Sequence, residues 1–220
     1  MQFRSMAVAV VAALALMAVP VGATPLTLTL SDGSNTVTVQ DGGAGDSNSA
    51  SGAVTWIGNL GVWVVNVSTG IGAPAVGTAY WPVLDLNSVN MSNAAGTLTL
   101  LLTQGGFASP PPPGFMFNIG GTTNGTVTAY ACAGVTLGNC EDVQLGPFNP
   151  VGSTAFSGST SFPFANPDED YQVGIKVVIH HDSGTLSSFD AEVQPVPEPG
   201  TYALIGAGLL GLGLLRRRLS

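Results

Sequence analysis

The sequence predicts an all-β protein: an antiparallel β-sandwich of a jelly-roll-like kind, flanked by an N-terminal signal peptide and a C-terminal hydrophobic helix. Three observations predict this. Apolar residues alternate with threonine in segments such as 26–30, which is the period of a half-buried strand. Such segments recur roughly every ten residues, with Gly, Asn, Asp and Pro between them. Between the two terminal segments, no stretch has a persuasive helical period.

The same alternation places the individual strands. We expect strands at 26–30, 37–39, 54–57, 62–67, 97–103, 126–132, 173–180 and 189–193. The run Ser109–Gly114 contains four consecutive prolines and cannot form a central strand, because proline lacks the amide donor that a ladder requires. We interpret it as a stiff, exposed connection between sheets.

The N-terminal segment has the pattern of a secretory signal peptide. Arg4 supplies a positive charge, Met6–Val19 is apolar, and Val21–Ala23 offers small residues for cleavage before Thr24. Residues 1–23 are therefore excluded from the fold, and the chain is assigned to the secretory route.

The exported region, residues 24–195, is long enough for one domain with a substantial core. This region is strongly acidic. It contains a single Lys or Arg, Lys176, and twelve Asp or Glu residues, which gives a net charge of −11. Such a surface cannot neutralise phosphates, which excludes nucleic acid as a partner. It remains suited to divalent cations or to neutral glycans.

The C-terminal segment, residues 196–220, combines three elements. Pro197, Glu198 and Pro199 break the chain, because proline and the residue before it disfavour a helix. An uncharged run follows from Thr201 to Leu215, and then Arg216, Arg217 and Arg218. Fifteen residues rise about 22 Å as a helix, against roughly 30 Å of hydrocarbon. We predict a transmembrane helix at about 201–215 with the arginines on the cytoplasmic side. A short span behind a rigid motif favours a processed signal over a permanent anchor.

This tail resembles the PEP-CTERM sorting signal, the substrate motif of exosortases in Gram-negative bacteria that make exopolysaccharide. The segments 64–70, 84–88, 96–100 and 188–193 are similar to a domain often found ahead of such a tail. The resemblance implies an exosortase as partner, and it implies no catalytic residues, because proteins of this kind are mostly matrix or surface components.

Cys132 and Cys140 are the two cysteines of the chain, and both lie in the exported region. An even number in an oxidising compartment predicts a disulfide between them. Closing so short a loop contributes on the order of 2–3 kcal/mol in the chain-entropy account.

A search for catalytic motifs finds no G-x-S-x-G, H-E-x-x-H or C-x-x-C. His180 and His181 are adjacent on an expected strand and would point to opposite faces, so we interpret them as the end of a strand before the turn at Asp182. The sequence therefore predicts no enzyme. Asp85 and Asp190 are the acids flanked by apolar strand residues, and a separation of about 5–9 Å in a cleft would favour a glycan-active enzyme.

Two further groups of residues are candidate binding sites. The glycine-rich loop with Asp41 and Asp46 offers hard oxygen ligands for a weak calcium site, with a solvated turn as the alternative. No other cofactor is expected. Tyr80 and Trp81 precede a proline in a predicted loop, which suggests an exposed platform for sugar rings, whereas Trp56 and Trp63 are expected in the core.

Together these patterns predict an exported, non-catalytic protein of the cell surface or extracellular matrix. We expect it to be sorted by an exosortase-type system, held in the membrane by its C-terminal helix before processing, and associated with exopolysaccharide in a biofilm. The alternative is a secreted glycan-active enzyme or a carbohydrate-binding module. A protein whose tail is never cut is a third reading.

Overall fold

The structure, a computed structural model, describes residues 23–108, 112–150, 154–164, 170–196 and 204–209. Most of the described chain is strand. The strands are β1 (Thr27–Ser31), β2 (Thr36–Gln40), β3 (Ala53–Leu60), β4 (Trp63–Ile71), β5 (Gly77–Thr78), β6 (Trp81–Pro82), β7 (Leu84–Ser92), β8 (Gly96–Phe107), β9 (Gly114–Thr123), β10 (Thr126–Gly134), β11 (Val143–Phe148), β12 (Ala155–Pro163), β13 (Tyr171–His181) and β14 (Leu186–Pro195).

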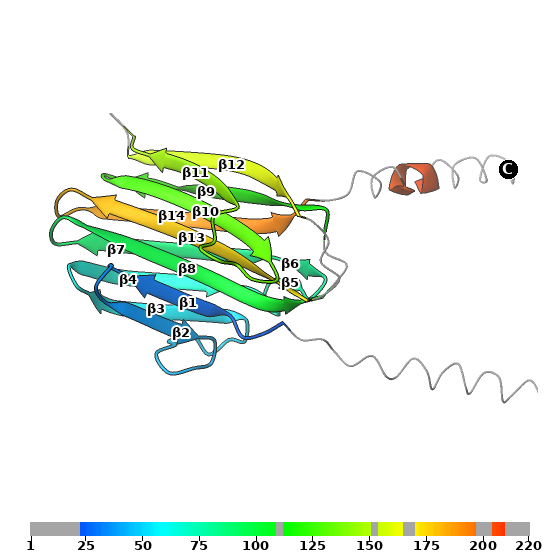
Figure 1. The fold of residues 1–220 in the computed structure, drawn as a ribbon, viewed down its shortest axis with the longest axis horizontal. Helices are drawn as coiled ribbons and strands as arrows, with labels where there is room; N and C mark the ends of the chain where they lie inside the picture. Colours follow the sequence, from blue (N-terminus) through cyan, green and yellow to red (C-terminus); the bar gives the residue numbers. More distant parts are fainter. Residues whose placement is uncertain (1–22, 109–111, 151–153, 165–169, 197–203, 210–220) are drawn as a thin grey trace, which may run out of the picture.

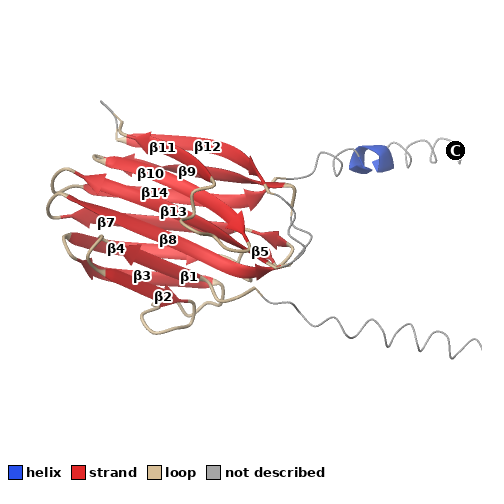
Figure 2. Cartoon of the chain, viewed as in Figure 1, coloured by secondary structure: helices blue, strands red, loops and turns tan. Residues whose placement is uncertain are grey.

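Twelve of these strands form two six-stranded antiparallel sheets that pack face to face (Figures 1 and 2). Sheet A has the order β11-β10-β13-β8-β1-β2, and sheet B has the order β12-β9-β14-β7-β4-β3. The short strands β5 and β6 pair with each other. The predicted antiparallel β-sandwich is therefore confirmed.

The connectivity from β7 to β14 is that of a jelly roll. The chain crosses between the sheets at almost every step, so that β8, β13, β10 and β11 are neighbours in one sheet and β7, β14, β9 and β12 in the other. The hairpins β1–β2 and β3–β4 then widen the two sheets on the same side. This topology makes β14, the last strand, a central strand of sheet B.

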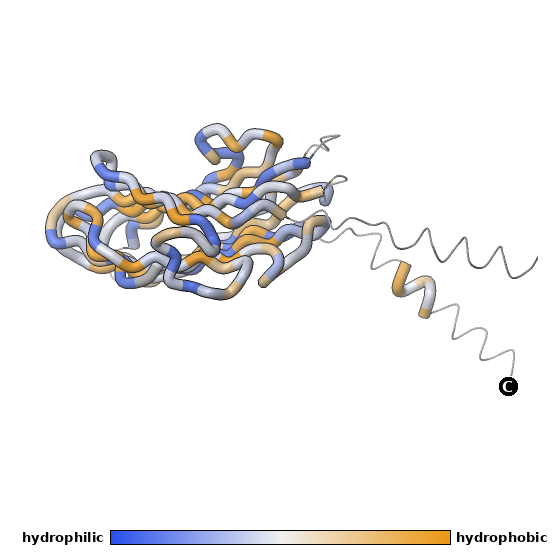
Figure 3. The backbone as a smooth tube through the Cα atoms, turned by 90° about the horizontal axis from the view of Figure 1, so that it is seen from below, coloured by the Kyte–Doolittle hydropathy of each residue, from blue (hydrophilic) through white to orange (hydrophobic). Residues whose placement is uncertain are grey.

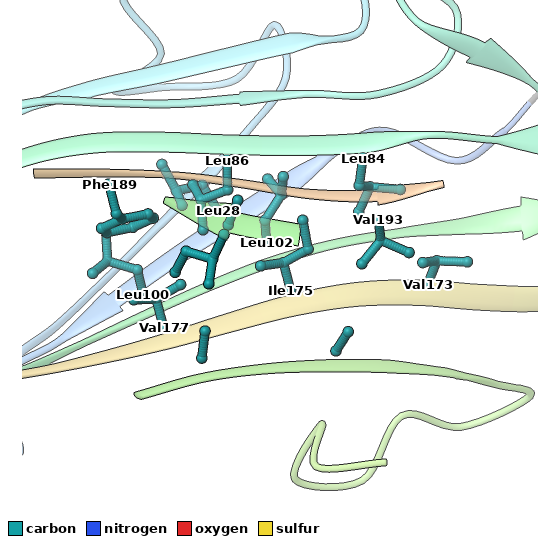
Figure 4. Packing of buried hydrophobic residues seen from close by; sticks show 14 of the residues in the cluster. Leu28, Leu84, Leu86, Leu100, Leu102, Val173, Ile175, Val177, Phe189 and Val193 are labelled. Carbon is teal, nitrogen blue, oxygen red and sulfur yellow. The ribbon is translucent and has the colours of Figure 1, made fainter. Parts of the chain in front are cut away.

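The space between the sheets is filled by the apolar side chains that the alternation predicts. Leu98, Leu100 and Leu102 on β8 are fully buried, as are their counterparts from β1, β13 and β7. Figure 4 shows Leu100 and Leu102 meeting side chains of the other strands between the two layers. The hydropathy of the backbone tube alternates along the strands in Figure 3, as this packing requires. Full burial of each such leucine contributes about 1.5–3 kcal/mol, which makes the apolar layer the main source of stability.

Besides the short β5 and β6, strands β7, β9, β11 and β12 were not among the predicted strand segments. Strand β9 is interrupted by Gly120 and Gly121, and three of the five exposed positions of β12 are serines, so neither has the contrast between apolar and polar residues that marks a strand. Strand β11 contains Pro147 and lies at the edge of sheet A, where a missing donor is tolerated.

The terminal segments lie largely outside the described residues. The predicted signal peptide, 1–23, is described only at Ala23, and the predicted span at 201–215 only at residues 204–209, which are helical and exposed. Among the described residues, no helix has the length and apolar character to span a bilayer. The proline-rich connection joins β8 to β9, with residues 109–111 outside the description.

Gly121 and Gly120 provide a matched test of the packing in sheet B. A Cβ at Gly121 would overlap the carbonyl oxygen of Ser188 and the backbone of Phe189, whereas a Cβ at Gly120 would meet no atom closer than 3.7 Å. We expect Gly121→Ala to lower the free energy of unfolding by about 1–3 kcal/mol, and Gly120→Ala to change it little. Urea unfolding followed by circular dichroism measures both, and equal stability of the two variants would contradict the packing described.

Candidate functional site

Three carboxylates gather on the outer face of sheet B. Asp85 on β7 lies directly opposite Glu192 on β14, and Asp190 is two residues before Glu192 on the same face. We call Asp85, Asp190 and Glu192 the carboxylate cluster. The neighbouring residues on β7 and β14 alternate with buried ones such as Leu84, Leu86 and Ala191, so the pleat turns these acids away from the core.

The carboxyl groups of Asp85 and Asp190 share a hydrogen bond, which requires a proton on one of them. Partial burial first, then the negative charges of Asp190 and Glu192, raise the pKa of Asp85 to about 6, and the bond to Asp190 acts in the same direction. A hydrogen bond from Asn87 opposes the shift. The cluster is therefore a place where a carboxyl group is held partly neutral near physiological pH.

A shallow depression of about 440 Å³ lies over the carboxylate cluster. Gly120 of β9 pairs with Asp190 and carries no side chain, which leaves the space open. Asn118 lines the same depression, and its Oδ1 accepts a hydrogen bond of 2.7 Å from the Ser159 hydroxyl. The floor thus offers carboxylates and an amide within one small area, which are groups that bind hydroxyls.

Tyr80 and Trp81 are exposed at the tip of the β5–β6 hairpin, with 61% and 43% of their surfaces accessible. The hydroxyl oxygen of Thr78 accepts hydrogen bonds from the amides of both residues and so fixes the turn. Along the chain toward β7, Pro82 and Leu84 are buried, so Trp81 falls on the same side as Asp85. Four residues of extended chain place them about 13 Å apart along the strand direction.

The two carboxylates of the predicted calcium loop are engaged by backbone amides. Asp46 Oδ2 accepts from Gly42 N at 2.9 Å, and its Oδ1 accepts from Asn48 N and Thr55 N, both at 2.9 Å. Asp41 Oδ2 accepts from Gly52 N at 2.7 Å. The loop therefore folds around these acids. Within the described part of the chain, no three acidic, histidine or cysteine side chains are arranged to hold a metal ion together.

Cys132 and Cys140 form a disulfide at the end of β10. Lys176, on the neighbouring strand β13, donates to the carbonyl of Asn139 at 2.8 Å, forms an ion pair with Glu141, and lies 4.5 Å from the centre of the Tyr130 ring. The Lys176 side chain thus helps to fix the disulfide loop.

The adjacent histidines lie on opposite faces of β13. His180 is exposed, and its Nε2 lies 3.1 Å from Asp182 Oδ1. His181 is buried, with Nδ1 bonded to Ser92 Oγ at 2.8 Å and Nε2 to Ser187 Oγ at 2.7 Å. Burial lowers the pKa of His181. Because water and substrate have no access to a buried ring, this serine–histidine contact is structural.

Trp63 is fully buried, as expected, and Trp56 is partly buried against the core. The Trp56 ring lies over Gly58 on its own strand, where a side chain would displace it. Of the sorting residues, Pro197, Glu198, Pro199, Arg216, Arg217 and Arg218 all lie outside the described residues. The sequence had singled out Asp85 and Asp190, but it gave no sign that Glu192 and Asn118 join them, because that depends on the register of three strands.

Comparison with protein families identifies one segment. Residues 195–218 match the PEP-CTERM protein-sorting motif, which covers the predicted sorting residues. The chain therefore carries a PEP-CTERM sorting signal, as the sequence predicted. This motif implies export, sorting to the cell surface and processing by an exosortase. No curated protein sequence matches the chain.

Several solved structures are similar to parts of the sandwich. The enzymatically active domain of bacteriophage CBA120 tailspike protein 4 is 16% identical, with 63% of this chain and 20% of that chain covered and a TM-score of 0.37. A β-glucosidase from Kluyveromyces marxianus in complex with glucose is 11% identical over 84% of this chain and 17% of its own, with a TM-score of 0.34. The carbohydrate-binding module TmCBM61, in complex with β-1,4-galactotriose, is 12% identical, with 63% of this chain and 92% of that chain covered and a TM-score of 0.33.

This chain spans about a fifth of the tailspike and glucosidase chains. At these identities and TM-scores, the likeness carries no argument about function, which has to come from the site itself.

Replacing Asp46 tests whether the glycine-rich loop depends on its carboxylate. We expect Asp46→Ala to lower the free energy of unfolding by about 1–2 kcal/mol, because three backbone amides lose their acceptor. Asp46→Asn keeps one acceptor oxygen and should lose less. Added calcium should leave the wild-type Tm unchanged, since a cation would have to displace these amides. A Tm that rises with calcium only when Asp46 is present would show instead that the loop is a calcium site.

The raised pKa of Asp85 makes a prediction about stability and pH. The folded state holds this proton more tightly than the unfolded chain does, so the contribution of Asp85 to stability is largest below about pH 4 and is lost as the pH rises through about 6. Asp85→Asn removes that loss. The full pKa shift of Asp85 would correspond to roughly 3 kcal/mol of unfolding free energy. Because Asp85 is partly exposed and solvent screens its charge, we expect an effect of about 1 kcal/mol.

We therefore expect Asp85→Asn to raise the Tm by about 2–4 °C relative to wild type near pH 7 and to have little effect near pH 4. Asp190→Asn should give a smaller change with the same pH dependence. Thermal unfolding at both pH values measures it, and an offset that is the same at both would contradict the assignment.

Proposed function

We propose that this exported protein is a non-catalytic glycan-binding protein of the cell surface, and that it binds neutral polysaccharide on the outer face of sheet B. The ligand would lie from the Tyr80–Trp81 hairpin to the carboxylate cluster. This proposal joins the expected association with exopolysaccharide to the carbohydrate-binding alternative that the sequence left open.

The observation that carries the proposal is the position of the exposed Trp81 ring on the same side of sheet B as a group of hydroxyl-binding side chains, with the exposed Tyr80 beside it in the chain. A sugar ring presents an apolar C–H face and an equatorial rim of hydroxyls. Trp81 and Tyr80 offer flat apolar surface for the first. The carboxylates of Asp190 and Glu192 and the amide of Asn118 offer hydrogen-bond partners for the second.

The charge of the molecule favours a neutral ligand. With a net charge of −11 over residues 24–195, the protein repels acidic polysaccharides, and three acids at the binding face strengthen that repulsion. Neutral glycans carry no charge to be repelled, and they bind through hydrogen bonds and ring contact.

The geometry of the carboxylate cluster supports binding rather than hydrolysis. Glycoside hydrolases keep their two carboxyl groups about 5–9.5 Å apart, so that a sugar or a water fits between them. Asp85 and Asp190 share a hydrogen bond, which leaves no such space between them. The depression above them is also shallow rather than a closed cleft. A raised carboxyl pKa alone does not make a general acid.

Affinity electrophoresis in gels that contain neutral β-glucan, galactan or mannan tests the proposal. We expect at least one of these polymers to retard the protein. Trp81→Ala should weaken that retardation about tenfold or more, because losing the ring contact costs on the order of 1.4 kcal/mol or more. Asp190→Asn should weaken it as well, through lost hydrogen bonds.

Leu186→Ala is the matched control, since Leu186 is equally exposed at the other end of β14. It should leave the retardation unchanged. Wild-type protein that is retarded by none of the neutral polymers, or equal retardation of wild type and Trp81→Ala, would refute the proposal. Release of reducing sugar from a polymer that is bound would show that the protein is an enzyme instead.

A further inference from the structure

Both ends of the exported domain are fixed at one end of the sandwich. Thr24 N donates to the carbonyl of Gly105 at 2.8 Å, and Gly105 N donates to Thr24 Oγ1 at 3.0 Å. Val196 N donates to the carbonyl of Gly114 at 3.0 Å. Figure 1 shows that the start of β1 and the end of β14 lie at the same end of the sandwich as the β5–β6 hairpin.

The exposed aromatic pair lies next to the point where the sorting tail begins. Val193 of β14 is opposite Leu84 of β7, which is the last pair of that ladder, and strand β6 ends two residues before Leu84. Strand β6 does contact β14. Trp81 on β6 is therefore close to the end of β14, where the sandwich ends.

The connection from the sandwich to the apolar run of the tail is short. Five residue steps separate Val196 from Thr201, and even a fully extended chain covers only about 17 Å over that length. The interfacial layer of a bilayer takes up about 5–8 Å on each side of the hydrocarbon. When the run from Thr201 to Leu215 is inserted as the sequence predicts, at most about 12 Å remains between the sandwich end and the headgroups.

We propose that, until the sorting tail is removed, Tyr80 and Trp81 dock on the phospholipid interface of the membrane that holds the tail. Tyrosine and tryptophan favour this interface, because an apolar ring and a polar tip suit the headgroup region. The short tether keeps the pair at a high effective concentration near that surface. The inference does not rest on glycan binding, and its readout is lipid contact alone.

Charge determines which lipids suit this contact. The loops at the tail end of the sandwich carry several acids, and the described ones are Asp41, Asp46, Glu141, Asp142 and Asp170. They repel anionic headgroups at low salt. The surface that fits the aromatic pair is therefore zwitterionic.

The full-length chain reconstituted into phosphatidylcholine vesicles tests the proposal, with brominated acyl chains as quenchers of tryptophan fluorescence. Trp56 and Trp63 lie in the sandwich, so the difference between wild type and Trp81→Phe isolates the emission of Trp81. We expect the vesicles to carry the protein on flotation. We expect brominated lipid to remove most of the Trp81 emission and little of the emission that remains in Trp81→Phe.

Leu186→Trp in the Trp81→Phe background places a matched reporter at the other end of β14, about 30 Å away along the strand. Its emission should not be quenched. Inserting about 20 Gly/Ser residues between Val196 and Pro197 adds a mean reach of roughly 25 Å and should restore most of the Trp81 emission. Protein that does not float, Trp81 emission that lipid leaves unchanged, equal quenching at position 186, or quenching unaffected by the insertion would each overturn the inference.

Discussion

The apolar layer between the two sheets is the constraint on which the rest of the structure depends. Every long strand must place one face in that layer, because burial of the side chains of residues such as Leu100 and Ile175 supplies most of the stability. The other face of each strand is then free for polar residues. Functional groups in this fold therefore belong to an outer face or to an end of the sandwich. The carboxylate cluster is an example of the first, and the Tyr80–Trp81 hairpin of the second.

Two groups of polar side chains, one inside the apolar layer and one outside it, affect the fold in opposite ways. His181 lies inside the layer and is tolerated because two serine hydroxyls satisfy both ring nitrogens. The carboxylate cluster lies outside it, yet its members repel one another, and Asp85 meets that repulsion by keeping a proton. The first arrangement stabilises the fold. The carboxylate cluster destabilises the fold at a pH above the pKa of Asp85. Acidic side chains that destabilise a fold are better explained by a role in binding than by a role in stability.

The fold could be predicted because the strand signal is local. The site could not be predicted, because its geometry depends on contacts between residues far apart in the sequence. Alternation within 26–30 or 173–180 identifies a strand from a few residues. Asp85 and Glu192 are more than a hundred positions apart, and only the pairing of β7 with β14 brings them together. Asp41 and Asp46 are close in the sequence, which predicts weak calcium ligands; backbone amides donate to carboxylate oxygens of both, and calcium binding stays a prediction. Glycine-rich β9 and serine-rich β12 escaped prediction because their strand character comes from their partners.

The jelly-roll path also determines from which end of the molecule the sorting tail leaves. Strand β14 is the last strand and a central one, so the tail leaves the middle of sheet B rather than a loose edge. Its antiparallel partner β7 begins at that same end, which places the hairpin before β7 beside the exit. The aromatic pair and the tail are therefore neighbours as a result of topology, whatever ligand the pair binds. If lipid holds Tyr80 and Trp81 while the tail is intact, a polysaccharide can reach them only afterwards, and processing would then determine when the protein binds as well as where it goes.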